Sequence, residues 1–190
     1  MTGAALLWLL GQQAVAGPAA AGVSGCLPDQ AGFLSMRLRG SIEAEVRWQE
    51  PELDCTGMAR PDGRGLRLRF AGPVAGRGTL AIVFAAPELG MGVSARAVPV
   101  NVTLLDDAGE RIYGTQGEER CAFDQVEQQA IHDAALPPRS YRVLARGFCT
   151  APARAMDGEG AVLLTRFDFA GVVSFGDDPA PAGNAATPAP

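Results

Sequence analysis

The amino-acid sequence predicts an all-β protein, an antiparallel β-sandwich or small barrel of about 6–8 strands with at most one short helix. Two observations support this fold class. Apolar and polar residues alternate with period two in several separate segments, which is the pattern of strands with one buried face. The 24 glycines and 14 prolines form a fifth of the 190 residues, which favours turns over long helices.

The length of the chain predicts one domain with enough core to fold alone. We expect a signal peptide over residues 1–25, a single β-rich domain over 26–175 and a tail over 176–190. The tail consists mostly of Asp, Pro, Ala and Gly without an apolar pattern, so it is expected to be disordered.

The longest alternating segment runs from Met36 to Trp48 and contains Gly40-Ser41. A two-residue hairpin at Gly40-Ser41 would place Leu38 opposite Glu43, although opposed residues share one face of a sheet. We therefore expect one long strand with a bend or bulge at Gly40. A three-residue turn centred on Gly40 would also keep the faces matched and is the alternative.

Further strands are predicted where alternation or an apolar run recurs. Residues 79–85 are apolar on both faces, which is typical of a central strand. Residues 98–105 and 111–115 predict a hairpin, because the turn sequence Asp106-Asp107-Ala108-Gly109 lies between them. The other predicted strands are 65–71, 141–149 and 161–175.

One helix is predicted over Gln125–Leu136. Asp124 would be its N-cap, and Glu127 follows three residues later, as in a capping box. Pro137-Pro138 would end it.

The N-terminal region has the features of an export signal. The apolar segment Ala4–Leu10 is followed by small residues, although no Lys or Arg precedes it. Two cleavage sites compete: Ala14–Ala16 matches the A-x-A motif, and Val23–Cys26 resembles the lipobox of bacterial lipoproteins. That resemblance implies that Cys26 carries a diacylglycerol and becomes the first residue. It also implies an outer-membrane location, because Leu27 and not Asp follows the cysteine.

The four cysteines form no C-x-x-C pair, and His132 is the only histidine. A zinc site of the usual Cys/His spacing is therefore not expected, and no metal site or cofactor is predicted. A calcium site at acidic turns such as Asp106-Asp107 is the alternative, although no EF-hand spacing is present. A disulfide between Cys121 and Cys149 is favoured, because both flank predicted strands. Cys55 would be unpaired if Cys26 carried a lipid, whereas Cys26–Cys55 would be a second disulfide if it did not.

The net charge is −5, and the 16 basic residues are all arginines interspersed with acids. Nucleic-acid binding needs a concentrated basic surface, so no nucleic-acid partner is expected. No run of 18 or more apolar residues is present, so a membrane-spanning helix is not expected either.

No catalytic residue is assigned from the sequence. His132 is the single candidate for a histidine base, and no nucleophile motif accompanies it. Glu43 and Glu45 share a strand face, as a general acid and base could. That face also carries three arginines, however, so a solvent-exposed ladder of ion pairs is expected.

The best sequence candidate for a ligand loop is Ala59–Gly65. Pro61-Asp62-Gly63 is a turn signature, and Arg60 and Arg64 flank it. Arg60, Asp62 and Arg64 could together recognise a carboxylate, phosphate or sugar acid. The simpler interpretation is a turn joining two strands.

These observations predict an exported protein of the bacterial cell envelope, lipid-anchored at Cys26 or free in the periplasm. The first functional hypothesis is a non-enzymatic β-sandwich module for binding or assembly, with a protein partner in the envelope and the membrane as partner through its lipid. The alternative is an envelope enzyme that uses carboxylates on a sheet face, acting on glycans. An enzyme should have a deep cleft with convergent carboxylates, whereas a binding module should have a flat apolar surface or an open strand edge.

Overall fold

The computed structural model of the chain describes residues 26–60, 64–115, 117 and 120–176. The predicted signal peptide and nearly all of the predicted tail lie outside these residues. The described part is all β, as predicted, but contains more strands than expected. They are β1 (Phe33–Gly40), β2 (Ala44–Gln49), β3 (Asp54–Ala59), β4 (Leu66–Val74), β5 (Gly78–Ala86), β6 (Ala95–Asp106), β7 (Arg111–Gly114), β8 (Cys121–Ile131), β9 (Ser140–Cys149), β10 (Ala153–Ala155) and β11 (Ala161–Ser174).

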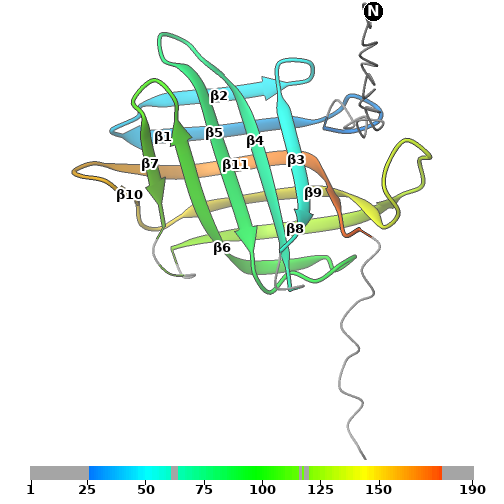
Figure 1. Cartoon of the computed structure of the whole chain (residues 1–190). Helices are drawn as coiled ribbons and strands as arrows, with labels where there is room; N and C mark the ends of the chain where they lie inside the picture. Colours follow the sequence, from blue (N-terminus) through cyan, green and yellow to red (C-terminus); the bar gives the residue numbers. More distant parts are fainter. Residues whose placement is uncertain (1–25, 61–63, 116, 118–119, 177–190) are drawn as a thin grey trace, which may run out of the picture.

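The strands form two layers that cross one another (Figure 1). One layer has the order β7-β6-β5-β4-β3, and the other has the order β2-β1-β11-β9-β8. The layers join where β6 pairs with β8, where β10 bridges β7 and β11, and where β11 meets β3 in parallel at Ser174–Met58. The result is a sandwich with barrel-like closure.

β6 forms one corner of this closure. Its residues 95–100 pair with β8 of the second layer, and its residues 101–106 pair with β5 of the first. A strand that passes from one layer to the other in this way is a common corner in crossed sheets.

Five phenylalanine rings fill the space between the layers. The Phe84 ring centroid lies 4.7 Å from that of Phe167 and 5.0 Å from that of Phe169. All five side chains are buried, and each large ring removes an extensive apolar surface from water. They are Phe70, Phe84, Phe123, Phe167 and Phe169.

A smaller apolar cluster lies apart from this core. Leu27 and Leu136 pack on Ala170 and Val172 of β11. These contacts secure the segment that precedes β1 and the connection between β8 and β9.

The segment Met36–Trp48 is a hairpin, and the prediction of one long strand was wrong. β1 pairs with β2 in a register that places Met36 opposite Val46 and Leu38 opposite Ala44. In this register each even-numbered residue of β1 lies opposite an even-numbered residue of β2. Residues that face the core on one strand therefore lie opposite residues that face the core on the other. Alternation alone cannot distinguish this turn from an uninterrupted strand. The turn is longer than the three-residue alternative and is centred on Ser41, whose N–H donates to the carbonyl of Ala161 at 2.9 Å.

The predicted helix Gln125–Leu136 was also wrong, because residues 121–131 form strand β8. Phe123 pairs with Gly147, and Gln125 pairs with the next residue, Arg146. Asp124 is therefore the extra residue of a β-bulge. Because of the bulge, the next buried residue after Phe123 is Val126 and not residue 125. The two buried positions are three residues apart, a spacing that is typical of a helix.

The other predicted strands are confirmed within one or two residues at most ends. Residues 79–85 form the central strand β5 between β4 and β6, and the hairpin β6–β7 forms around the predicted turn. Strands β3 and β10 were not predicted, because both are short and neither alternates strongly.

Candidate functional site

Cys121 and Cys149 lie directly opposite each other on β8 and β9 and form a disulfide, as the sequence favours. The bond closes a sequence separation of 28 residues. It fastens the last strand of the second layer to its neighbour at the end of their ladder.

Cys26 forms a disulfide with Cys55, which is the alternative that the sequence left open. The Cys26 side chain is fully buried, and its backbone N–H donates to the Glu50 carboxylate at 2.8 Å. The other Glu50 oxygen accepts from the Gly32 N–H, also at 2.8 Å. A sulfur atom in a disulfide cannot also carry a lipid, so lipid attachment at Cys26 stays a prediction that competes with this bond.

The predicted ligand loop is the turn between β3 and β4. The Arg60 N–H donates to the Gly65 carbonyl at 3.3 Å, and the Arg64 side chain is exposed. Asp62 lies outside the described residues. The structure thus places Arg60 and Arg64 on a hairpin turn, apart from the polar hollow described below.

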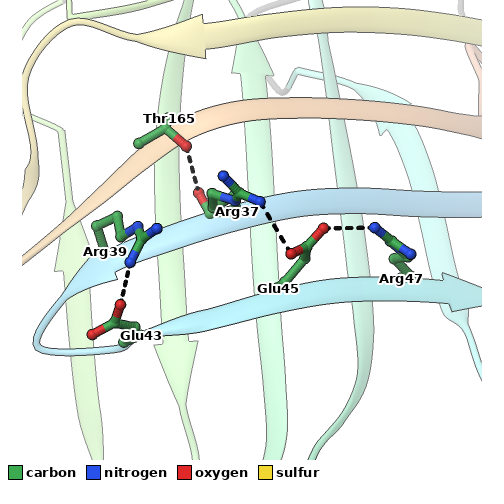
Figure 2. A network of polar contacts seen from close by, with 6 residues as sticks. All are labelled: Arg37, Arg39, Glu43, Glu45, Arg47 and Thr165. Carbon is green, nitrogen blue, oxygen red and sulfur yellow. Dashed lines mark hydrogen bonds and ion pairs between the residues drawn. The ribbon is translucent and has the colours of Figure 1, made fainter.

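The predicted ladder of ion pairs is confirmed on the hairpin β1–β2 (Figure 2). Glu45 accepts from Arg37 at 3.1 Å and from Arg47 at 2.7 Å, and these two bonds lower the pKa of Glu45. Arg39 pairs with Glu43 near the turn. Both carboxylates are therefore engaged by guanidinium groups and do not form an acid and base pair.

The candidate site is a hollow of about 710 Å³ on the face of the second layer turned away from the core. We call it the outer hollow. Three strands, β1, β11 and β9, and the bulge of β8 provide its walls. Its lining residues are Ser35, Asp124, Arg146, Gly147, Phe148, Thr165, Arg166, Phe167 and Asp168.

The outer hollow lies where the ladder between β9 and β11 ends. These strands pair from Ser174–Ser140 as far as Phe167–Gly147, and β10 pairs with β11 only from Val162 onward. Residues 163–166 of β11 therefore have no described strand partner on that side. Backbone groups without a ladder partner need other hydrogen-bonding partners, such as water or a ligand.

Two β-bulges border this gap. In β11, Arg37 pairs with Arg166 whereas Leu38 pairs with Leu164, so Thr165 is an extra residue. The second is the Asp124 bulge of β8. Each bulge places consecutive polar side chains on the outer face, and bulges commonly redirect side chains at functional sites.

Gly147 lies between the two bulges, where β9 approaches β8 and the Phe167 ring closely. A Cβ atom there would lie 2.0 Å from the Ala122 carbonyl oxygen and 2.7 Å from the Phe167 ring. The position therefore admits only glycine without movement of the backbone. Phe167, which is buried, forms the apolar floor at this point.

A row of polar side chains crosses the strands in register. Ser35 of β1 lies opposite Asp168 of β11, which lies opposite Arg146 of β9. Arg146 Nε is 3.6 Å from the Asp124 carboxylate across the next gap. Strands are spaced about 4.8 Å apart, so the row alternates hydrogen-bond acceptors and donors at that interval.

Enclosure by the walls of the hollow raises the pKa of Asp168, although the side chain still reaches solvent. The Arg146 charge and the Phe169 N–H oppose this shift. The balance means that the carboxylate of Asp168 is incompletely compensated by its protein neighbours.

The second row contains Arg37 and Arg166. Arg166 lies directly opposite Arg37, with like charges on one face. Among the described residues, no carboxylate lies within ion-pair distance of Arg166. Phe148 also lines the hollow, and this residue is 45% exposed, which is unusual for one with so large an apolar side chain.

The sequence alone does not predict this site. It predicts Asp124 as a helix N-cap, and Arg146, Arg166 and Asp168 lie within the predicted strands 141–149 and 161–175. Their convergence depends on the register of β1, β11, β9 and β8, which the sequence does not specify. The only local signal was the break in alternation after Phe123.

No cluster of three His, Cys, Asp or Glu side chains that could hold a metal ion occurs among residues 26–60, 64–115, 117 and 120–176. Within the same residues, no helix is long and apolar enough to cross a membrane. The two disulfides are typical of a protein that folds outside the cytoplasm. Comparisons with protein-family models, with curated proteins and with solved structures find no match for this chain.

Proposed function

We propose that this protein is an exported bacterial envelope module that binds a hydroxyl-rich, glycan-type ligand in the outer hollow. The observation that carries the proposal is the gap between β9 and β11, where two bulges gather polar side chains around an interruption of the ladder. A structural role alone would be served better by a continuous ladder.

The chemistry of the lining supports a glycan. Asp124, Asp168 and Arg146 offer acceptors and donors in alternation, which suits sugar hydroxyls because each hydroxyl both donates and accepts. Ser35 adds a hydroxyl to the same row. Phe148 offers an exposed ring on which the apolar face of a pyranose can pack.

The binding role is favoured over the enzymatic alternative. The outer hollow is open, and Arg146 lies between its two carboxylates, Asp124 and Asp168. The Arg146 charge opposes the rise in the pKa of Asp168 that burial causes, which works against the use of Asp168 as a proton donor.

The disulfides support export to an oxidising compartment. The bond between Cys26 and Cys55 supports a periplasmic form without a lipid, because it uses the sulfur that the lipid would need. Intact-mass measurement of the mature protein from its host separates the two forms. A lipid on Cys26 would replace this part of the proposal.

The ligand site is tested by titrating ¹⁵N-labelled protein with a neutral oligosaccharide, the tetramer of N-acetylglucosamine, and with acidic oligosaccharides. We expect amide shifts confined to residues around Arg146, Gly147 and Arg166. Phe148→Ala should weaken binding, whereas Met156→Ala, an exposed apolar residue outside the lining, should not. Absence of shifts in the outer hollow with every probe would overturn the proposal. Release of reducing ends that Asp124→Asn abolishes would favour the enzyme.

A further inference from the structure

The arrangement of charge in the outer hollow specifies the ligand more closely. This inference rests on the proposed function. We infer that the ligand is an acidic sugar of the uronic-acid class, whose carboxylate binds at Arg166 and whose ring hydroxyls bind the row of Ser35, Asp168 and Arg146.

The first argument is the pair Arg37 and Arg166. Like charges directly opposite one another on neighbouring strands repel, and such pairs are destabilising without a counter-ion. Arg37 is partly neutralised by Glu45, at 3.1 Å. Arg166 has no such acid among the described residues, so an anion from a ligand would complete this pair.

The second argument is geometric. A guanidinium binds a carboxylate through two parallel hydrogen bonds, which gives orientation as well as affinity. Arg166 lines the gap, so a carboxylate bound there enters the outer hollow and does not lie on a flat surface. Thr165, the bulged residue beside it, is also exposed to the gap.

The third argument is the distance between the two rows. Arg166 and Asp168 are two residues apart on one face of β11, which corresponds to about 7 Å along a strand. A pyranose ring that carries a carboxylate on one side and hydroxyls on the other can reach both rows. Asp168 would repel a second anion, so the polar groups that face it should be neutral hydroxyls.

The alternative ligand charges fit less well. A neutral glycan would leave Arg166 without an acid, and a ring with several anionic groups would meet Asp124 and Asp168. One carboxylate per ring, with hydroxyls elsewhere, matches Arg166 beside one row of alternating hydrogen-bond acceptors and donors.

The test compares oligomers of glucuronate, galacturonate and mannuronate with their own methyl esters. Each pair has the same ring and differs in the carboxylate charge. We expect the acid of at least one pair to bind ten or more times more tightly than its ester, as measured by calorimetry and by amide shifts in the outer hollow. The affinity of the acid should fall with added salt, and that of the ester should not.

Two variants assign the effect to the residue. Arg166→Gln should bring the affinity of the acid down to that of the ester, because the amide keeps a donor but loses the charge. Arg39→Gln removes an arginine that pairs with Glu43 outside the lining, and it should leave the difference between acid and ester unchanged.

The outcomes separate this inference from the proposed function. Binding of neutral oligosaccharides or esters in the outer hollow, with no preference for any acid, overturns the inference and leaves the glycan site in place. A preference for the acid that Arg166→Gln does not alter also overturns it. Absence of shifts in the outer hollow with every probe overturns both.

Discussion

The Arg77 guanidinium donates to the Asp106 carboxylate at 2.7 Å and thereby links the β4–β5 turn to the end of β6. The Asp106 side chain is 1% exposed, whereas that of Arg77 is 33% exposed. The second Asp106 oxygen, Oδ1, is buried without a hydrogen-bond partner among the described residues. Arg77 is therefore the principal compensation for a buried charge at this end of the molecule.

Arg77→Met should destabilise the protein by about 2–4 kcal/mol, because it leaves the Asp106 charge buried without an ion partner. Urea unfolding at pH 7 measures the change. Arg47→Met is the matched control, since it removes an exposed partner of Glu45 and should cost less than about 1 kcal/mol. Equal effects of the two substitutions would contradict this account of Arg77.

Removal of the Cys121–Cys149 disulfide by a double substitution to Ala should lower the unfolding free energy by about 3–4 kcal/mol in the chain-entropy model. Removal of Cys26–Cys55 should have a similar effect, because the sequence separations are 28 and 29 residues. Denaturant unfolding of both double variants provides the comparison. Non-reducing peptide mapping of the unmodified protein should recover these two pairs, and any other pairing would contradict the structure.

Gly147→Ala should destabilise the protein by about 1–3 kcal/mol or more, because the added carbon meets the Ala122 backbone and the Phe167 ring. Gly114→Ala is the control within a strand. There the nearest atom, the Met156 sulfur, is 3.9 Å away, so little change is expected. Thermal unfolding measures both. A Gly147→Ala protein of unchanged stability would show that the hollow does not need this close approach of β8, β9 and β11.

Asp168→Asn should stabilise the protein at neutral pH, since the raised pKa means that the fold disfavours the ionised carboxylate. That penalty is present above the folded pKa and disappears as the pH falls below the ordinary value of 3.8. The stability difference between variant and wild type should therefore shrink from pH 7 towards pH 3, as followed by urea unfolding. A stability difference that increases as the pH falls would contradict the raised pKa of Asp168.

Arg146→Gln provides an independent measurement of the same electrostatics. The Arg146 charge lowers the pKa of Asp168, so its removal should raise that pKa further in an NMR titration. Arg39→Gln, which pairs with Glu43 near the β1–β2 turn, should leave the titration of Asp168 unchanged.

Much of the strand content could be predicted from the sequence, because burial on one face imposes period two. β1, β2 and most of β9 follow that rule closely. β8 does not, because the bulge at Asp124 shifts its pattern and its polar residue Gln128 is buried. The Gln128 amide accepts from the Gly92 N–H and donates to the carbonyls of Gly90 and Val93, and these partners come from a distant loop.

The candidate site could not be predicted from the sequence, for a related reason. Ser35, Asp168 and Arg146 are far apart in the chain and become neighbours only through the register of three strands. The same limit explains the hairpin at Ser41, since an odd-membered turn preserves the alternation of an uninterrupted strand. The pairing of Cys121 with Cys149 was more accessible, because each cysteine lies at the end of a strand.

The central position of β11 has a consequence for biogenesis. The strand β11, the last within the described residues, pairs with β1, β3, β9 and β10, and its residue Ala170 lies opposite Phe33 at the start of β1. The second layer cannot be completed, and β11 cannot join it to β3 and β10, until the ribosome has synthesised residue 174. A nascent chain that ends before β11 therefore lacks the one strand with which both β1 and β9 pair among the described residues.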